Sequence, residues 1–242
     1  MSAIYDTIGI NYADLRRPDP RIAMAIVLAL GAAKTILNVG AGAGSYEPAD
    51  RAVTAVEPSI EMIRQRAATS APAIQGHAEA LPFADDSFDA AMAVLTIHHW
   101  TDKLKGLAEM RRVARGPVVL LTFDPAHRFW LNDYVPELAA LDDVIMPKLT
   151  DYEAWLGPVE ITPVPIPHDC LDGFLYAYWR RPAAYLDPRI RAAMSSFWKI
   201  EGVAARLEKL EADLSSGVWA RQNADILELD VYDVGYRLVT TI

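Results

Sequence analysis

Residues 36–45 read ILNVGAGAGS, an apolar run that ends in three alternating glycines. The run Thr35–Val39 is typical of a short β-strand, and Gly40 breaks it. Small residues at such a break let the backbone turn sharply and approach a ligand that Cβ atoms would exclude. The N–H groups of the turn favour polar or anionic ligand atoms. The stretch therefore predicts a strand followed by a ligand-binding turn, and a plain tight turn is the alternative.

The spacing of the glycines argues against two familiar nucleotide-binding loops. The dinucleotide fingerprint needs a glycine five positions after the first, but that position is Ser45 counted from Gly40 and Glu47 counted from Gly42. A phosphate-binding loop that ends in Gly-Lys-Ser or Gly-Lys-Thr is also absent from the sequence. A nicotinamide-dependent oxidoreductase is therefore disfavoured.

An acidic residue ends the next predicted strand. Residues 52–56 form a second β-rich run, and Glu57 follows it, 17 residues after Gly40. A carboxylate at the end of the second parallel strand lies beside the ligand crevice and can accept both hydroxyls of a ribose. The alternative is a carboxylate that caps the helix predicted to begin near Ser59. The combination of strand, glycines, strand and acid favours a nucleoside site over either piece alone.

Strand-like and helix-like segments alternate along the chain. The strands are predicted at 35–39, 52–56, 88–95, 117–123, 159–164 and 236–242, and the helices at 21–30, 59–68, 102–114, 189–200 and 203–214. This alternation favours an α/β fold with a mostly parallel sheet that helices cover on both faces. Because no polar linker divides the chain, we expect one domain over residues 1–242.

The charge balance and the single cysteine exclude several classes of function. The 242 residues contain 23 Lys and Arg against 32 Asp and Glu, a formal charge of −9. Nucleic acids and anionic membranes are bound by clustered positive charge, so neither partner is expected. The lone Cys170 excludes an internal disulfide and a cysteine-based zinc site. The longest apolar run, 22–33, is too short to span a bilayer, and no signal-peptide pattern is visible. We expect a cytoplasmic protein without a bound metal.

Four segments, in order, resemble the class I S-adenosylmethionine-dependent methyltransferases of the ubiquinone and menaquinone branch, or methyltransferase type 11. Residues 38–45 (NVGAGAGS) resemble the first motif, and residues 55–62 (AVEPSIEM) resemble the acidic motif that follows it. Residues 76–89 (GHAEALPFADDSFD) are similar to the third-strand motif, and residues 109–122 resemble the next helix and strand. The resemblance covers about residues 35–125. It implies a Rossmann-like class I methyltransferase fold with a mostly parallel seven-stranded sheet and a helical lid near the C-terminus.

The resemblance also implies a cofactor, S-adenosyl-L-methionine, with S-adenosyl-L-homocysteine as the product. The cofactor-binding residues that it implies are Gly40, Ala41, Gly42, Gly44, Glu57, Pro58, His77, Ala78, Leu95, Tyr12 and Arg16. The glycines would wrap the methionine and the ribose, and Glu57 would hold the ribose hydroxyls. His77 stands where the family usually has Asp, which accepts a hydrogen bond from the adenine amine.

The N-terminal segment, residues 1–34, is expected to cover the cofactor. Tyr12 and Arg16 are four residues apart and share one face of a helix. The guanidinium of Arg16 is suited to the methionyl carboxylate because its fork pairs with a carboxylate through two hydrogen bonds. The alternative is that Arg16 and Arg17 are a solvated pair that ends a helix.

The catalytic candidates, His98 and His99, follow the predicted strand 88–95. Ligands of open α/β sheets bind beyond the carboxyl ends of the strands, so both imidazoles are expected near the methyl group. An imidazole with its usual pKa can accept a proton at neutral pH. We expect His99 to face the methyl group and His98 to point the other way, with activity falling below about pH 6. The alternative is that the pair packs on the cofactor or caps the next helix. Trp100 either stacks on a flat acceptor or fills the core.

The late segment 168–225 is predicted to be a helical lid. Within it, Phe174 and Tyr178 are the candidates for an aromatic acceptor pocket, and a packed helix is the alternative. The whole pattern predicts methyl transfer to an oxygen, nitrogen or carbon atom of a small molecule by a monomer or homodimer. The alternative function is a protein that binds S-adenosylmethionine without methylating a substrate.

Overall fold

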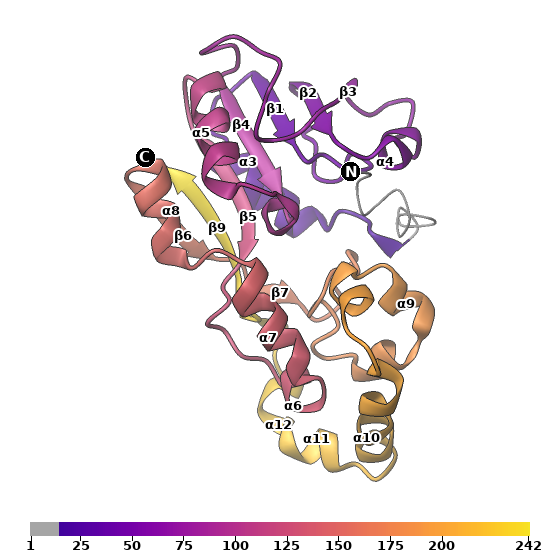
Figure 1. The fold of residues 1–242 in the computed structure, drawn as a ribbon. Coiled ribbons are helices and arrows are strands. Elements are labelled where there is room, and N and C mark those ends of the chain that lie inside the picture. Colours follow the sequence, from indigo (N-terminus) through magenta and orange to yellow (C-terminus); the bar gives the residue numbers. More distant parts are fainter. Residues whose placement is uncertain (1–14) are drawn as a thin grey trace.

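The computed structural model describes residues 15–242, and a seven-stranded sheet forms its core. The strands are β1 (Thr35–Val39), β2 (Ala52–Glu57), β3 (Ala73–Gln75), β4 (Ala90–Val94), β5 (Val118–Phe123), β6 (Val159–Pro163) and β9 (Tyr236–Thr241). Their order in the sheet is β3-β2-β1-β4-β5-β9-β6 (Figure 1). Only β9 runs antiparallel to its neighbours, β5 and β6. The mostly parallel α/β sheet that the sequence predicts is confirmed.

The central strands are buried on both faces because helices pack around the sheet. All six residues of β5, which read VVLLTF, are buried. The covering helices include α3 (Pro20–Ala29), α4 (Ile60–Arg64), α5 (Lys103–Val113) and α8 (Leu149–Leu156). The Asp19, Ser59 and Asp102 side chains accept backbone hydrogen bonds at the starts of α3, α4 and α5, which fixes where these helices begin.

The other helices form a lobe below the sheet in Figure 1. They are α6 (Leu131–Tyr134), α7 (Pro136–Ile145), α9 (Pro188–Ala192), α10 (Val203–Ser215), α11 (Val218–Gln222) and α12 (Ala224–Leu227), with 3₁₀ turns η2 (Pro182–Leu186) and η3 (Ser195–Lys199). A small ribbon of β7 (Ile166–Pro167) and β8 (Val231–Tyr232) lies where the lobe meets the sheet.

The lobe is larger than the predicted segment 168–225. The Tyr134 hydroxyl donates a hydrogen bond to Asp213 over 2.9 Å, and the Trp130 and Trp219 rings pack edge to face at 5.2 Å. Residues 130–145 therefore belong to the same lobe. The predicted helix 189–200 is also wrong in detail, because the chain breaks there into α9 and η3.

No helix within residues 15–242 is long and apolar enough to cross a membrane.

Candidate active site

The glycine turn sits at the carboxyl end of β1 with three residues in left-handed conformations. Gly40, Gly42 and Gly44 have φ of +68°, +52° and +96°, values that favour glycine. The N–H groups of Gly40 and Ala41 both donate to the carbonyl oxygen of Val56, over 2.8 and 3.1 Å. A Cβ atom on Gly40 would lie 2.2 Å from Thr96 Oγ1. Glycine is therefore required for the close approach of this turn to the end of β4.

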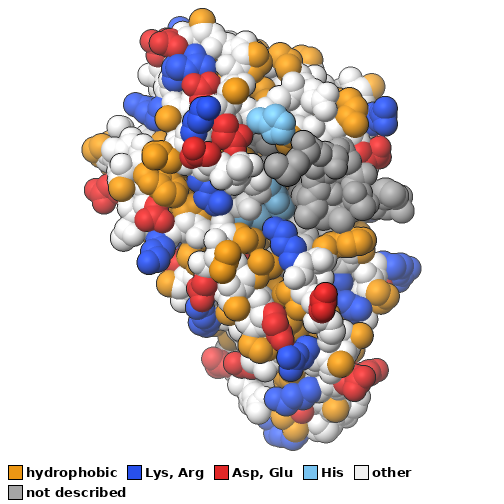
Figure 2. Space-filling view, in the orientation of Figure 1, with side chains coloured by type: hydrophobic (Ala, Val, Ile, Leu, Met, Phe, Trp, Pro, Cys, Tyr) orange, Lys and Arg blue, Asp and Glu red, His pale blue; other side chains and the backbone are white. Residues whose placement is uncertain are grey.

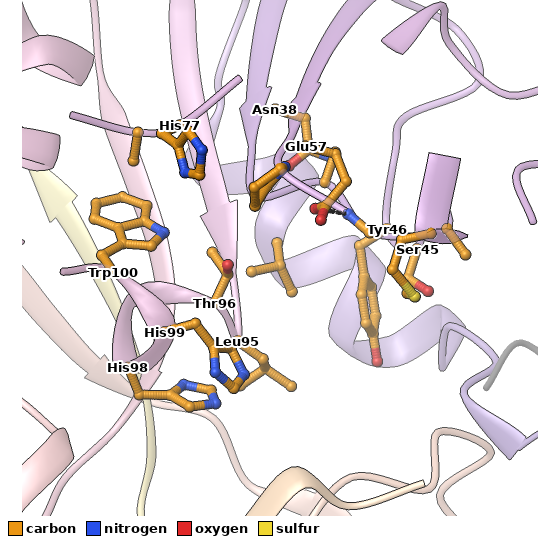
Figure 3. Close-up of a pocket in the computed structure, with 18 of the residues that line it drawn as sticks. Asn38, Ser45, Tyr46, Glu57, His77, Leu95, Thr96, His98, His99 and Trp100 are labelled. Atoms are coloured by element: carbon orange, nitrogen blue, oxygen red, sulfur yellow. Dashed lines mark hydrogen bonds between the residues drawn. The ribbon is translucent and has the colours of Figure 1, made fainter. Parts of the chain in front are cut away.

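Glu57 holds the turn from the end of β2. Its Oε2 accepts a hydrogen bond from the Gly42 N–H over 2.8 Å, and its Oε1 accepts one from the Ser59 N–H over 2.9 Å. The side chain also lines the cavity in front of the turn (Figure 3). Glu57 therefore makes the contact at the start of α4 that one sequence interpretation expects. Its contact with a ribose stays a prediction.

An outer cavity of about 410 Å³ opens in front of these strand ends. Figure 2 shows histidine side chains in this hollow of the surface. Most of the site residues predicted from the sequence line this cavity: Gly40, Ala41, Gly42, Glu57, Pro58, His77, Ala78, Leu95, Arg16, His98, His99 and Trp100. Gly44 does not line it, and Tyr12 lies outside the described residues. Sequence reasoning missed Tyr46, Met62 and Lys199, which also line it.

Replacement of Gly42 by valine is expected to lower affinity for S-adenosylmethionine by at least about tenfold. The new side chain would enter the cavity, and overpacking costs about 1–3 kcal/mol. Since φ is +52° at Gly42 and +56° at Gly31, where nothing lies within 4 Å of an added Cβ, Gly31→Val is a control with the same backbone strain. Calorimetric titration should show normal affinity in Gly31→Val, and equal affinities in the two variants would contradict the assignment.

His98 and His99 face the cavity together. They lie on the 3₁₀ turn η1 (Ile97–His99), and their ring centroids are 3.9 Å apart. Both line it because a 3₁₀ turn does not alternate its side chains as a strand does. That only one of them faces the methyl group stays a prediction. Both rings appear beside Leu95 in Figure 3.

Burial keeps the histidine pair uncharged. It holds the pKa of His98 well below its usual value, and the neighbouring His99 lowers that pKa further. Burial, with Lys199 and Arg16 nearby, lowers the pKa of His99 to about 3. The His99 imidazole is therefore neutral from pH 5 to pH 8, and a loss of activity below pH 6 does not follow from its titration.

Arg16 lines the cavity and forms an ion pair with Asp172 of the lobe. Its Nε donates to Asp172 Oδ1 over 2.6 Å, and the Tyr46 hydroxyl donates to Asp172 Oδ2 over 2.9 Å. Asp172 is fully buried, and Arg16 and Asp172 also form an isolated antiparallel bridge. These contacts join the N-terminal segment, the residue after the glycine turn and the lobe at the cavity wall.

A second, inner cavity of about 60 Å³ lies beside the first. Leu95, His98 and Arg16 line both cavities. The lobe supplies Asp142 and Phe174 among the other lining residues. Phe174 is thus at a cavity wall, as the aromatic-pocket prediction requires, whereas Tyr178 lines neither cavity and packs edge to face on Tyr185 at 5.8 Å.

Trp100 and Cys170 are both buried. The Trp100 ring lines the outer cavity and packs on α5, where a Cβ atom on Gly106 would lie 2.6 Å from it. Cys170 is buried, and burial raises the pKa of its thiol to about 12, which makes it a poor nucleophile. Among the described residues, no group of three or more His, Cys, Asp or Glu side chains is placed to hold a metal ion.

Three cavity-lining residues other than glycine have positive φ. The values are +64° at Tyr46, +52° at Leu95 and +68° at Tyr176. Such conformations cost bulky side chains free energy, and they cluster at ligand sites. Leu95 directly follows β4 and lines both cavities.

The donors and acceptors of the outer cavity fit S-adenosylmethionine. The Glu57 carboxylate lines the cavity at the end of β2, and the glycine turn has a shape that side chains would block. A methyltransferase-domain family profile matches residues 37–121. A crystal structure of a putative methyltransferase from an antibiotic biosynthesis pathway of Anabaena variabilis is 38% identical, with a TM-score of 0.88, over 95% of this chain and 100% of that one.

The chain belongs to the class I S-adenosylmethionine-dependent methyltransferases. The methyltransferase is 36% identical over 108 residues to the demethylmenaquinone methyltransferase of Renibacterium salmoninarum, which covers 40% of this chain and 46% of that protein. It is 31% identical over 122 residues to an uncharacterized methyltransferase, YcgJ, of Bacillus subtilis, over 46% of this chain and 45% of that one. The chain thus spans less than half the length of these curated relatives. The predicted family, fold and cofactor are confirmed.

Proposed function

We propose that this methyltransferase transfers the methyl group of S-adenosylmethionine to a small molecule. The observation that carries the proposal is the pair of adjoining cavities, about 410 and 60 Å³ in volume, with walls from both sheet and lobe. Lys199 of the lobe lines the outer cavity, and Met194, Ser195 and Ser196 line the inner one. Cavities of this size hold metabolite-sized ligands. The formal charge of −9 also disfavours a nucleic-acid substrate.

The cofactor supplies an activated methyl group on a positively charged sulfur. The chain's own part is to bind this group, exclude water and place the acceptor in line. In this proposal Glu57 and the glycine turn hold the cofactor. Arg16, at the cavity wall, binds the methionyl carboxylate of the cofactor. Leu95 and the two histidines lie where the acceptor approaches. The acceptor atom can be oxygen, nitrogen or carbon.

The test incubates the protein with a metabolite pool and a cofactor labelled in its methyl group. We expect labelled small-molecule product and an equal amount of S-adenosylhomocysteine. Binding of the cofactor with no S-adenosylhomocysteine and no label transfer would favour the alternative, a protein that binds the cofactor without methylating. A cytoplasmic location and a monomeric or homodimeric state remain predictions, which fractionation and sedimentation would test.

We further propose that His99 contacts the acceptor as a neutral imidazole. His99→Gln is expected to lower turnover with cofactor affinity nearly unchanged, by less than the roughly 10²–10⁴-fold typical of a general base, because an imidazole with a pKa of about 3 is a weak base. Because burial lowers the pKa of His99 to about 3, the imidazole stays deprotonated and titrates nowhere between pH 5 and pH 8. The turnover of His99→Gln is compared with that of the wild type and of His98→Gln. Full turnover in His99→Gln would show that the acceptor supplies its own nucleophile.

A further inference from the structure

Asp142 is a buried carboxyl group at the wall of the inner cavity. It lies on α7 and is 5% exposed. Within residues 15–242 it forms no ion pair, whereas the adjacent Asp143 is exposed and pairs with Arg128 over 3.0 Å. A buried carboxylate without a cation is costly unless a partner compensates the charge. Neither the cofactor site nor the histidine pair uses this group.

A chain of hydrogen bonds holds the Asp142 side chain in place. The Tyr176 hydroxyl donates to Asp142 Oδ2 over 3.1 Å, and the Asn132 amide donates to the Tyr176 hydroxyl over 3.1 Å. The Phe129 N–H donates to Asn132 Oδ1 over 2.8 Å, which fixes the amide. Asp142 Oδ1 has no hydrogen-bond partner among the described residues. The carboxyl group is thus oriented with one acceptor oxygen to spare.

The rest of the inner cavity is mostly apolar and rich in aromatic rings. The rings that line it belong to Phe123, Phe174, Tyr176 and Tyr236. The hydroxyls of Tyr236 and Thr122 already have partners, the Leu175 carbonyl oxygen and the Tyr152 hydroxyl. Aromatic faces attract cations, as a carboxylate does.

We infer that the inner cavity binds a protonated amine of the acceptor, with Asp142 as its counter-ion. The inference rests on the proposed function and names the acceptor class: an apolar molecule with an ammonium head group. An ammonium group supplies both the missing charge and a donor for Oδ1. A neutral hydroxyl would supply only the donor.

The size of the cavity decides which part of the acceptor enters. The inner cavity, about 60 Å³, is much smaller than the outer one, about 410 Å³, so we assign the head group to the inner cavity. Leu95 and His98 line both cavities, so the body of the ligand can extend into the outer one. A protonated nitrogen has no lone pair to attack a methyl group. The ammonium group therefore anchors the acceptor, and the methyl group goes to another atom on its body.

Binding of the amine should strengthen between pH 6 and pH 8. Burial raises the pKa of Asp142 to about 7, so the carboxylate forms over this range. The amine, with a pKa near that of lysine at about 10.4, stays protonated. Two tyrosines and a histidine also face Asp142: burial raises the pKa of Tyr176 and Tyr236 well above 10 and lowers the pKa of His98. The other charged groups near it are Arg16, Arg128 and Asp143.

The test measures ligand affinity by calorimetry in the protein saturated with S-adenosylhomocysteine. The probes are three amines, butylamine, phenethylamine and tyramine, each compared with the alcohol that carries a hydroxyl in place of the amine. We expect at least one amine to bind about tenfold more tightly than its alcohol at pH 8, and less so at pH 6. Asp142→Asn should abolish this preference. Asp143→Asn, its exposed neighbour on α7, should keep it.

The control readout is the affinity for S-adenosylhomocysteine, which both variants should retain together with the wild-type circular dichroism. Normal S-adenosylhomocysteine affinity without preference for any of the three amines would overturn the inference and leave the proposed function standing. A preference that survives in Asp142→Asn would also overturn it. Failure of the wild type to bind S-adenosylhomocysteine would instead contradict the cofactor site itself.

Discussion

Glu57→Ala is expected to weaken S-adenosylmethionine binding by roughly 10²–10⁴-fold. The carboxylate is proposed to accept both ribose hydroxyls, and each hydrogen bond to a charged group contributes about 1.5–3 kcal/mol. The effect has a second source, because Glu57 also accepts the N–H groups of Gly42 and Ser59. The alanine variant loses both the ligand contact and the shape of the turn.

The two sources of this effect can be separated by measuring stability beside affinity. Two N–H groups without partners cost about 1–3 kcal/mol each when they stay buried, so the free energy of unfolding should fall as well. Glu57→Gln keeps one acceptor oxygen and should lose less of both quantities. Glu61→Ala, on α4 and away from the cavity, is the matched control for affinity and should leave the affinity unchanged. A folded Glu57→Ala protein with wild-type affinity in calorimetric titration would rule out the ribose contact.

Asp142→Asn is expected to stabilise the protein at pH 8 by roughly 4 kcal/mol. Burial raises the pKa of Asp142 from 3.8 to about 7, and each pKa unit corresponds to about 1.36 kcal/mol. At a pH between these two pKa values, Asp142 is protonated in the folded state and deprotonated in the unfolded state. Stability therefore falls as the pH rises from about 4 to 7, and the cost is complete above pH 7.

The measurement is urea unfolding of the wild type and the variant at each pH from 4 to 8. The advantage of Asp142→Asn should be near zero at pH 4 and should grow until about pH 7. Asp143→Asn should show no such growth, since Asp143 is exposed and paired with Arg128. A difference that does not depend on pH would mean that Asp142 titrates normally.

The residues that line the outer cavity could be located in the sequence because the signals are local. Gly40 follows β1 and Glu57 ends β2, and strand ends can be located from apolar runs and glycines. That both histidines line the cavity was not expected, because a 3₁₀ turn and not a continued strand follows β4. No pattern in the sequence distinguishes a short turn of this kind from an extended end.

Apart from Phe174, the lining of the inner cavity could not be predicted, because long-range contacts create it. Asp142 and Asp143 are identical neighbours in the sequence, yet Asp142 is buried and bonded to Tyr176, whereas Asp143 is exposed and paired with Arg128. Arg16 and Asp172 are 156 positions apart. The lobe extends upstream of residue 168 because α6 and α7 join it through contacts distant in sequence, among them Tyr134 with Asp213 and Glu137 with Arg206.

The left-handed backbone at Leu95, Tyr46 and Tyr176 limits how the protein can be redesigned. The strained backbone at each of these residues lowers the stability of the folded protein by about 1–3 kcal/mol, and each side chain lies at a cavity wall. Library mutagenesis at these positions would change backbone shape and pocket shape together, since glycine relieves the strain and β-branched residues increase it. An engineer who wants a different acceptor should therefore vary Met194 and Ser195, which line the inner cavity without that constraint.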